Sequence, residues 1–265
     1  MSSSEFISKI DYYCHKKESL FNQSKSKYAI RSMFAGAFLT FSTAGDAIGA
    51  DLLNNIVPSS GYFLFPFVFA WGLVYIVFLN AELVTSNMMY LTAGVYQKNI
   101  RLSKAVTILL YCGIFNLIGA MIIGAAFAYS AAFNAMDVQH FIVHLVQGKA
   151  TRGNGQVLLE AILANIFVNV AILAFLLIKD ETAKMWIIIS AIFMFVFLGE
   201  EHVVANFASF SIVKFSAVSP SLEFMNWFNL IRHWVVAFIG NTIGGGVIVG
   251  LAYAFLNKTK SVYHE

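Results

Sequence analysis

The chain has 265 residues, of which 59% are hydrophobic and 12% charged, and its formal net charge is +3. Its mean hydropathy is +0.73, which means more apolar surface than a water-soluble fold could bury. The composition excludes a soluble globular domain and predicts an all-α protein whose solvent is the lipid bilayer.

The first 28 residues are predicted to form a cytoplasmic, partly amphipathic helix that leads into the membrane. This stretch contains lysines and no continuous apolar run, so it does not resemble a cleavable signal peptide. Cys14 lies in this stretch and Cys112 in a later apolar segment, and they match neither a metal site nor a disulfide. We expect no metal ion and no cofactor.

Six apolar windows are long enough to cross a hydrocarbon core, which takes roughly 20 helical residues. They lie near 29–54, 62–95, 105–134, 156–178, 185–213 and 229–256. The predicted organisation is an N-terminal helix over 1–28, a six-span domain over 29–257 and a cytoplasmic tail over 258–265.

Lys and Arg are distributed unevenly between the two sides that these spans define. Most fall in the N-terminal stretch and in the segments on its side, which is typical of cytoplasmic loops. We therefore predict a multi-pass protein of the cytoplasmic (inner) membrane with both termini in the cytoplasm. This asymmetry explains the positive net charge, and no nucleic-acid partner is expected.

Spans two and five contain a stretch that aligns without gaps. Residues 77–87 read VFLNAELVTSN and residues 196–206 read VFLGEEHVVAN. Spans three and six repeat a second pattern in the same order, NLIG from Asn116 and NTIG from Asn241. Two matches in one order favour an ancestral duplication. Because each half holds three spans, the second copy is predicted to be inverted, with a transport path between the halves.

Spans two and five are also longer than one crossing needs, and each carries polar residues near its middle. Lipid offers no hydrogen bonds, so we predict that both helices are interrupted there, with half-helix N-termini that favour an anion. Glu82 and Glu201 are equivalent in the repeat, and we expect their carboxylates to accept the freed backbone N–H groups. Asn87 and Asn206 receive the same structural interpretation.

His202 and Thr85 interrupt the repeat, because their equivalents are Leu83 and Val204. A histidine within a span can titrate near neutrality or donate a hydrogen bond to a passing anion. The hydroxyl of Thr85 could orient His202 or touch the substrate. The alternative for His202 is an imidazole tied to a backbone carbonyl. We expect no second histidine in the spans, which argues against a metal-dependent intramembrane hydrolase.

In the segments AELVTSN (81–87), EEHVVAN (200–206) and NTIGGG (241–246), the sequence resembles the formate/nitrite transporter family. The likeness runs from Gly36 to Ala254. It implies a homopentamer of six-span protomers with an aquaporin-like fold, in which each protomer has its own pore and helices two and five are broken.

The resemblance also implies roles for particular residues. His202 becomes the central pore histidine and Thr85 its partner, with Asn165 and Val168 beside the pore. Hydrophobic constrictions are implied at Phe69, Leu73, Leu83, Val84 and Phe195. Lys149 is expected to attract anions at the outer entrance, and the alternative is an ordinary solvated loop lysine. Lys17, or its neighbour Lys16, is expected at the inner entrance.

Members of that family carry formate, nitrite, lactate or hydrosulfide. We expect a channel or transporter for small monovalent weak-acid anions and no enzymatic activity. Hydrosulfide is preferred on the general likeness of the chain to the hydrosulfide channels of that family and because Val84 is smaller than the phenylalanine often found at that place. Formate or nitrite is the alternative. A neutral-solute channel is less favoured, because paired Asn-Pro-Ala motifs are absent and the chain has only three prolines.

Overall fold

The computed structural model of the chain describes residues 5–257, and every regular element in that range is helical. The predicted all-α class is confirmed. The expected tail over 258–265 lies outside the described residues.

The first half of the chain contains six of the described helices. Its helices are α1 (Glu5–Gln23), α2 (Lys25–Ile56), α3 (Gly61–Phe69), α4 (Trp71–Phe78), α5 (Val84–Tyr96) and α6 (Leu102–Ala128). The first long helix begins four residues earlier than the predicted span. Ser24 causes this early start, because its side chain caps the helix by accepting a hydrogen bond from the backbone N–H of Lys27 at 3.3 Å.

The second half contains six further α-helices, two 3₁₀ turns and a π-helix within the described residues. Its elements are α7 (Phe141–Ala150), α8 (Asn154–Leu177), α9 (Glu181–Phe197), α10 (Val203–Phe215), the 3₁₀ turns η1 (Ser219–Ser221) and η2 (Glu223–Met225), α11 (Trp227–Asn241), the π-helix η3 (Thr242–Leu251) and α12 (Ala252–Asn257). The π-helix was not expected from the sequence.

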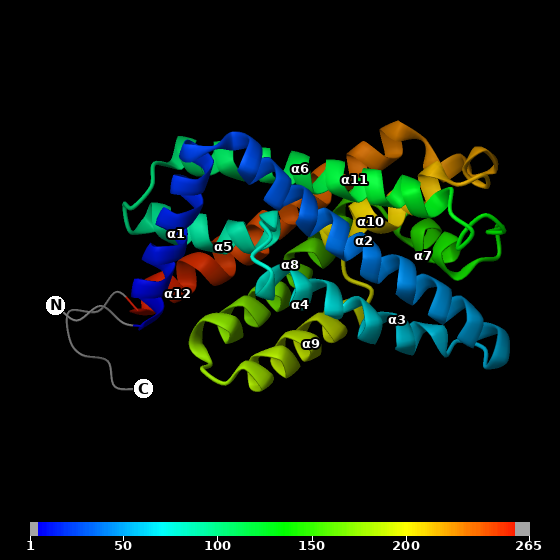
Figure 1. Cartoon of the computed structure of the whole chain (residues 1–265), viewed down its shortest axis with the longest axis horizontal. Helices are drawn as coiled ribbons and strands as arrows, with labels where there is room; N and C mark the ends of the chain where they lie inside the picture. The colour runs from blue at the N-terminus through cyan, green and yellow to red at the C-terminus, as the bar shows by residue number, and fades with distance from the viewer. Residues whose placement is uncertain (1–4, 258–265) are drawn as a thin grey trace.

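The long helices run along the long axis of the molecule, and helices α1 and α7 lie at its two ends (Figure 1). Within the described chain, four segments are long and apolar enough to cross a membrane, namely Gly61–Phe78, Leu102–Ala128, Asn154–Leu177 and Trp227–Asn257. Helix α2 has 32 residues but buries many small polar side chains inside the bundle. The chain is thus a multi-pass membrane protein.

Glycines allow the long helices to approach one another closely. A Cβ atom on Gly36 of α2 would lie 2.0 Å from a backbone oxygen of α6, and one on Gly119 of α6 would lie 2.0 Å from a backbone oxygen of α2. A Cβ atom on Gly244 of η3 would lie 2.1 Å from a backbone oxygen of α8. The glycine pattern of the spans therefore serves backbone packing.

The predicted interruptions of spans two and five are confirmed. The first separates α4 from α5 and the second separates α9 from α10. Both begin with the same turn. The backbone N–H of Ala81 donates to the carbonyl of Ile76 at 3.0 Å, and that of Glu200 donates to the carbonyl of Phe195 at 3.1 Å. The residue before each donor has a positive φ, 56° at Asn80 and 76° at Gly199, as asparagine and glycine tolerate best.

Candidate functional site

Two half-helices meet at the centre of the molecule through Thr85 and His202. Thr85 lies in the first turn of α5, and His202 is the N-cap of α10. The hydroxyl oxygen of Thr85 is 2.8 Å from Nε2 of His202, and both side chains are buried. The structure thus brings together the two residues that interrupt the sequence repeat.

The hydrogen bonds of His202 determine what this pair can offer a ligand. Nδ1 accepts a hydrogen bond from the backbone N–H of Ala205 at 3.1 Å. In the neutral ring the proton is therefore on Nε2, which donates it to the hydroxyl oxygen of Thr85. The hydroxyl hydrogen of Thr85 is then free for an anion. The imidazole is held by a backbone N–H and a hydroxyl, not by the backbone carbonyl that was the alternative expectation.

Side chains of helix α8 hold the backbone carbonyl of Thr85 by hydrogen bonds. The side-chain amide of Asn165 donates to the backbone carbonyl of Thr85 at 3.2 Å and to that of Asn241 at 2.7 Å. Asn169, which the sequence analysis did not single out, donates to Asn165 and also reaches Thr85 at 3.5 Å. Val168 is buried on the same helix, three residues after Asn165.

Asn116 of α6 closes the first interruption. Its Oδ1 accepts the backbone N–H of Val84 at 2.9 Å, and its Nδ2 donates to the carbonyl of Glu82 at 2.8 Å. Nδ2 also donates to the carbonyl of Ser32 at 2.7 Å. The freed backbone groups are therefore satisfied by an asparagine amide, a role that the sequence analysis did not assign although the repeat had marked Asn116.

Glu82 supports the first interruption differently from the expectation. Its carboxylate does not take the freed backbone N–H groups, because Asn116 already does so. Its Oε2 instead accepts from Lys17 at 3.0 Å, Asn87 at 3.0 Å and Tyr28 at 3.2 Å. The carboxylate thus ties α1 and α2 to the start of α5.

The second interruption repeats this arrangement. Oε2 of Glu201 accepts from Lys149 at 3.0 Å and from Asn206 at 2.7 Å, and Oε1 accepts from Arg152 at 2.5 Å. Asn241 takes the place that Asn116 has in the first half. Its Oδ1 accepts the N–H of Val203 at 2.8 Å, and its Nδ2 donates to the carbonyl of Glu201 at 2.9 Å.

The two lysines expected at the entrances are buried in ion pairs. Lys17 is 6% exposed and Lys149 is 9% exposed. Lys17 belongs to α1 and Lys149 to α7, and each pairs with the glutamate of the nearer interruption. Helix α1 is therefore the counterpart of α7, which the sequence did not reveal. Lys16 donates to the side-chain oxygen of Asn80 at 3.1 Å.

A small cavity of about 40 Å³ opens at each end of the bundle. The α1 vestibule is lined by Tyr13, Lys16, Lys17, Ile76, Val77, Asn80, Ala81, Glu82, Ser86, Tyr90, Ile172 and Phe175. The α7 vestibule is lined by Thr43, Phe65, Phe69, Leu145, Lys149, Phe195, Val196, Gly199, Glu200, Ala205, Asn206 and Ser209. Each has room for a water molecule or a small anion.

One face of α3 and α4 runs from one vestibule to the other. Phe69 lines the α7 vestibule, Ile76 lines the α1 vestibule, and Leu73 lies between them on the same face. The ring of Phe69 meets that of Phe195 edge-on with centroids 6.2 Å apart, and Phe195 is 5.8 Å from the ring of His202. Apolar side chains therefore lie beside the Thr85–His202 pair along this face.

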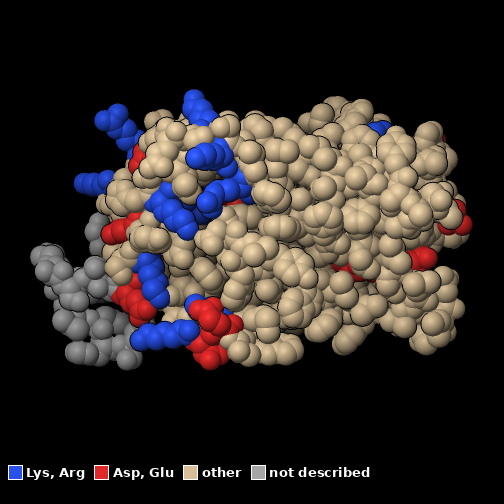
Figure 2. Space-filling view, viewed as in Figure 1, with Lys and Arg blue, Asp and Glu red and all other residues tan. Residues whose placement is uncertain are grey.

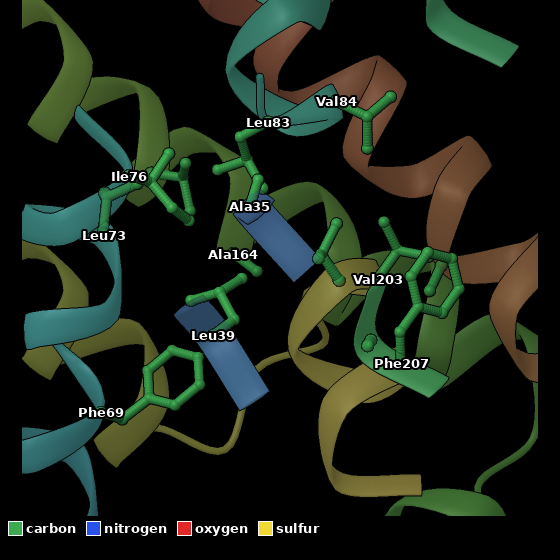
Figure 3. Packing of buried hydrophobic residues seen from close by; sticks show 14 of the residues in the cluster. Ala35, Leu39, Phe69, Leu73, Ile76, Leu83, Val84, Ala164, Val203 and Phe207 are labelled. Carbon is green, nitrogen blue, oxygen red and sulfur yellow. The ribbon is translucent and has the colours of Figure 1, made fainter. Parts of the chain in front are cut away.

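Leu83 and Val84 point in different directions. Leu83 lies on the side of Leu73 and Ile76, whereas Val84 points away from them (Figure 3). A Cβ atom on Gly113 of α6 would lie 3.7 Å from a methyl group of Val84. The structure thus groups Leu83 with Leu73 and separates Val84 from them.

His233 corrects the expectation that the spans hold no second histidine. It is fully buried in α11, and its Nε2 lies 3.5 Å from Oε2 of Glu201. The residue lay within the sixth predicted span and was overlooked. Within residues 5–257, no three His, Cys, Asp or Glu side chains are grouped so that they could hold a metal ion.

A family model described as formate/nitrite transporter matches residues 4–255. A formate channel of Bacillus thuringiensis, BtFdhC, is 30% identical over 235 residues, which are 88% of this chain and 87% of that protein. A formate-nitrite transporter of Plasmodium falciparum is 24% identical, over 86% of this chain and 77% of that protein.

Two solved structures share the fold. A structure described as an FNT family ion channel has a TM-score of 0.87 at 23% sequence identity, covering 94% of this chain and 98% of that one. A pentameric formate channel with formate bound has a TM-score of 0.74 at 21% identity, covering 87% and 96%. The aquaporin-like arrangement of interrupted helices expected from the sequence is therefore the fold of these channels.

Proposed function

Because the chain belongs to the formate/nitrite transporter family, we propose that it is a channel through which small monovalent weak-acid anions cross the membrane. The observation that carries the proposal is the contact of 2.8 Å between Thr85 and His202. This contact joins the N-termini of two half-helices, where backbone N–H groups favour negative charge.

The path runs from one vestibule past the Thr85–His202 pair to the other. On the α7 side an anion passes the rings of Phe69 and Phe195, and on the α1 side it passes Leu73 and Leu83. A bare charge pays a large desolvation cost between these apolar side chains. Lys149 and Lys17, which line the two vestibules, lower that cost at the entrances.

At the centre the anion accepts a hydrogen bond from the hydroxyl of Thr85. The neutral ring of His202 donates from Nε2 to the oxygen of that hydroxyl and so leaves the hydroxyl hydrogen for the anion. A hydronium ion that enters from a vestibule protonates the anion and leaves water, and the conjugate acid crosses the next apolar constriction as a neutral molecule. Asn165 and Asn169 keep the carbonyl of Thr85 in place during this exchange.

We also propose that the chain crosses the bilayer six times and that both termini lie on the cytoplasmic side of the inner membrane. Lys and Arg gather over the α1 end of the molecule (Figure 2), which supports a cytoplasmic position for that end. A homopentamer is proposed from the fold shared with the pentameric formate channel.

Two anions, formate and hydrosulfide, are each favoured by a different argument, and hydrosulfide is the one proposed. The relative named as a formate channel favours formate. Hydrosulfide is favoured by its small size and by a conjugate acid that forms near neutral pH, which gains most from a shared proton. The small side chain of Val84 is a weak argument for hydrosulfide, because it points away from Leu73 and Leu83.

A liposome flux assay tests the proposal. The purified protein is exposed to matched gradients of formate, nitrite, hydrosulfide, chloride and glycerol. We expect weak-acid anions to pass, hydrosulfide fastest, and glycerol to be excluded. Formate or nitrite passing faster than hydrosulfide rejects the preferred anion only. Glycerol passing while every anion is retained rejects the proposed function.

A further inference from the structure

Glu200 is a carboxylic acid in the wall of the α7 vestibule. It lies in the interruption between α9 and α10 and lines the cavity together with Lys149 and Phe195. Its equivalent in the first half is Ala81, which lines the α1 vestibule. The two vestibules are built alike and differ at this position, so Glu200 interrupts the repeat as His202 and Thr85 do.

The carboxyl group of Glu200 is only partly solvated. The side chain is half-buried, and its Oε2 is inaccessible and has no hydrogen-bond partner within residues 5–257. An unpartnered buried oxygen is costly as part of a carboxylate, and a proton or an incoming donor removes that cost. Glu200 thus differs from Glu82, whose Oε2 accepts three hydrogen bonds, and from Glu201, both of whose oxygens accept hydrogen bonds.

The charged groups that act on Glu200 come from three neighbouring elements. They are the carboxylates of Glu160 in α8 and Glu201 in the interruption, and the cations Lys149 at the end of α7 and Arg152 just after it. Both cations already have partners. Lys149 pairs with Glu201 at 3.0 Å, and Arg152 pairs with Glu160 at 2.6 Å and with Glu201 at 2.5 Å.

We propose that Glu200 controls anion entry through the α7 vestibule according to the pH on that side. When ionised, its carboxylate repels an anion in a cavity of about 40 Å³. When protonated, it removes that repulsion and offers an O–H donor to the anion. The α1 vestibule has alanine at this position and lacks the control. This inference rests on the proposed anion channel.

The test compares wild-type protein with Glu200→Gln in vesicles that contain the protein in one orientation. Formate is the probe, because it stays ionised between about pH 5.5 and about pH 8 while a glutamate in a vestibule can titrate. The pH is varied on the α7 side alone. Wild-type entry from that side is expected to rise about tenfold on acidification. Glu200→Gln is expected to be fast at high pH as well, so that it loses the part of the pH profile that Glu200 causes and keeps only the part that belongs to the Thr85–His202 pair.

Glu223→Gln is the matched control. Glu223 is exposed in η2 at the same end of the molecule, outside the residues that line the α7 vestibule. Its loss changes the net charge in the same way and is expected to leave the wild-type pH profile intact. A merely structural role of Glu200 would lower flux at all pH values without changing the profile.

A gain-of-function variant keeps the test decisive if Glu200→Gln does not fold. Ala81→Glu places a carboxylic acid in the α1 vestibule and is expected to make entry from that side depend on the pH there. An unchanged profile in folded Glu200→Gln, or no effect of Ala81→Glu, overturns the role of Glu200 and leaves the channel standing. Wild-type protein that passes no anion at any pH overturns the proposed function instead.

Discussion

Asn116 and Asn241 satisfy the backbone of the two interrupted helices with the same hydrogen bonds. In each, Oδ1 accepts the N–H of the first residue of the half-helix, at 2.9 Å and 2.8 Å. In each, Nδ2 donates to the carbonyl two residues earlier, at 2.8 Å and 2.9 Å. One amide thus replaces the helical partners that an interruption inside a bilayer removes.

Replacing either asparagine by leucine is expected to destabilise the protein. Asn116→Leu and Asn241→Leu keep the branching at Cγ but leave buried backbone groups unpaired, at a cost of about 1–3 kcal/mol for each group. Thermal unfolding in detergent measures the loss. Asn134→Leu, in an exposed loop, is the control. Unfolding temperatures equal to wild type would show that the amides are dispensable.

The buried ion pair of Lys149 and Glu201 predicts a non-additive pattern. Glu201→Gln leaves a buried lysine without its carboxylate, and a loss of about 3–5 kcal/mol is expected. Lys149→Met combined with Glu201→Gln removes both charges and is expected to be less destabilising than the sum of the single changes. Chemical or thermal denaturation of the four proteins measures the coupling, and strictly additive effects would contradict it.

Lys149 is also expected to affect transport. It lines the α7 vestibule, so Lys149→Gln should lower anion flux most at low ionic strength. Salt screens the attraction between a charge and an approaching anion over about 8–10 Å, whereas the buried pair of Lys149 with Glu201 is screened much less. Flux in liposomes at low and high salt tests this. A reduction of equal size at both would assign Lys149 to the support of Glu201 alone.

The hydroxyl of Thr85 is expected to matter more for transport than its methyl group. Thr85→Val keeps the shape and removes the donor, so flux should fall about tenfold or more, as for a lost hydrogen bond to a charged ligand. Thr85→Ser keeps the hydroxyl and should retain most flux. Equal flux in Thr85→Val and wild type would exclude the hydroxyl from the path.

His202→Asn should change the pH dependence of flux while the protein stays folded.

His140, which caps α7 outside the spans, predicts a pH dependence of stability. Burial lowers the pKa of His140 below its ordinary value of 6.5, against the opposing effect of Asp51 and Asp137. The unfolded chain therefore binds this proton more readily, so the stabilisation is present above about pH 6.5 and is lost as the pH falls through the folded pKa. His140→Asn keeps a capping side chain and should flatten this dependence below about pH 6.5. Parallel stability–pH curves for both proteins would contradict the assignment.

The interruptions could be predicted from sequence because the evidence for them is local. Polar residues in the middle of an apolar segment, repeated in both halves, leave few other structures in lipid. The pairing of Lys17 and Lys149 with glutamates could not be predicted in the same way. It joins residues 65 and 52 positions apart, and the lysines lie in helices α1 and α7, outside the segments that revealed the repeat.

The direction in which the side chain of Val84 points could not be predicted from the sequence either. Leu83 has an extended backbone and Val84 is the first helical residue. The orientation of two successive side chains depends on where the helix begins, and a shift of one residue turns a side chain by about a quarter of a circle.

The bonds that hold each interruption stay within one half of the chain. In the first half, the backbone N–H of Val84 donates to Asn116, and the carboxylate of Glu82 pairs with Lys17. In the second half, the backbone N–H of Val203 donates to Asn241, and the carboxylate of Glu201 pairs with Lys149. The first half thus contains the partners of its own freed backbone groups before the ribosome has made the second half, which adds the hydrogen bonds of Asn165 and Asn169 to the carbonyl of Thr85. The backbone groups at the start of α5 therefore have hydrogen-bond partners in the membrane before the second half is synthesised. The contact between Thr85 and His202 forms only after that, as a late step of biogenesis.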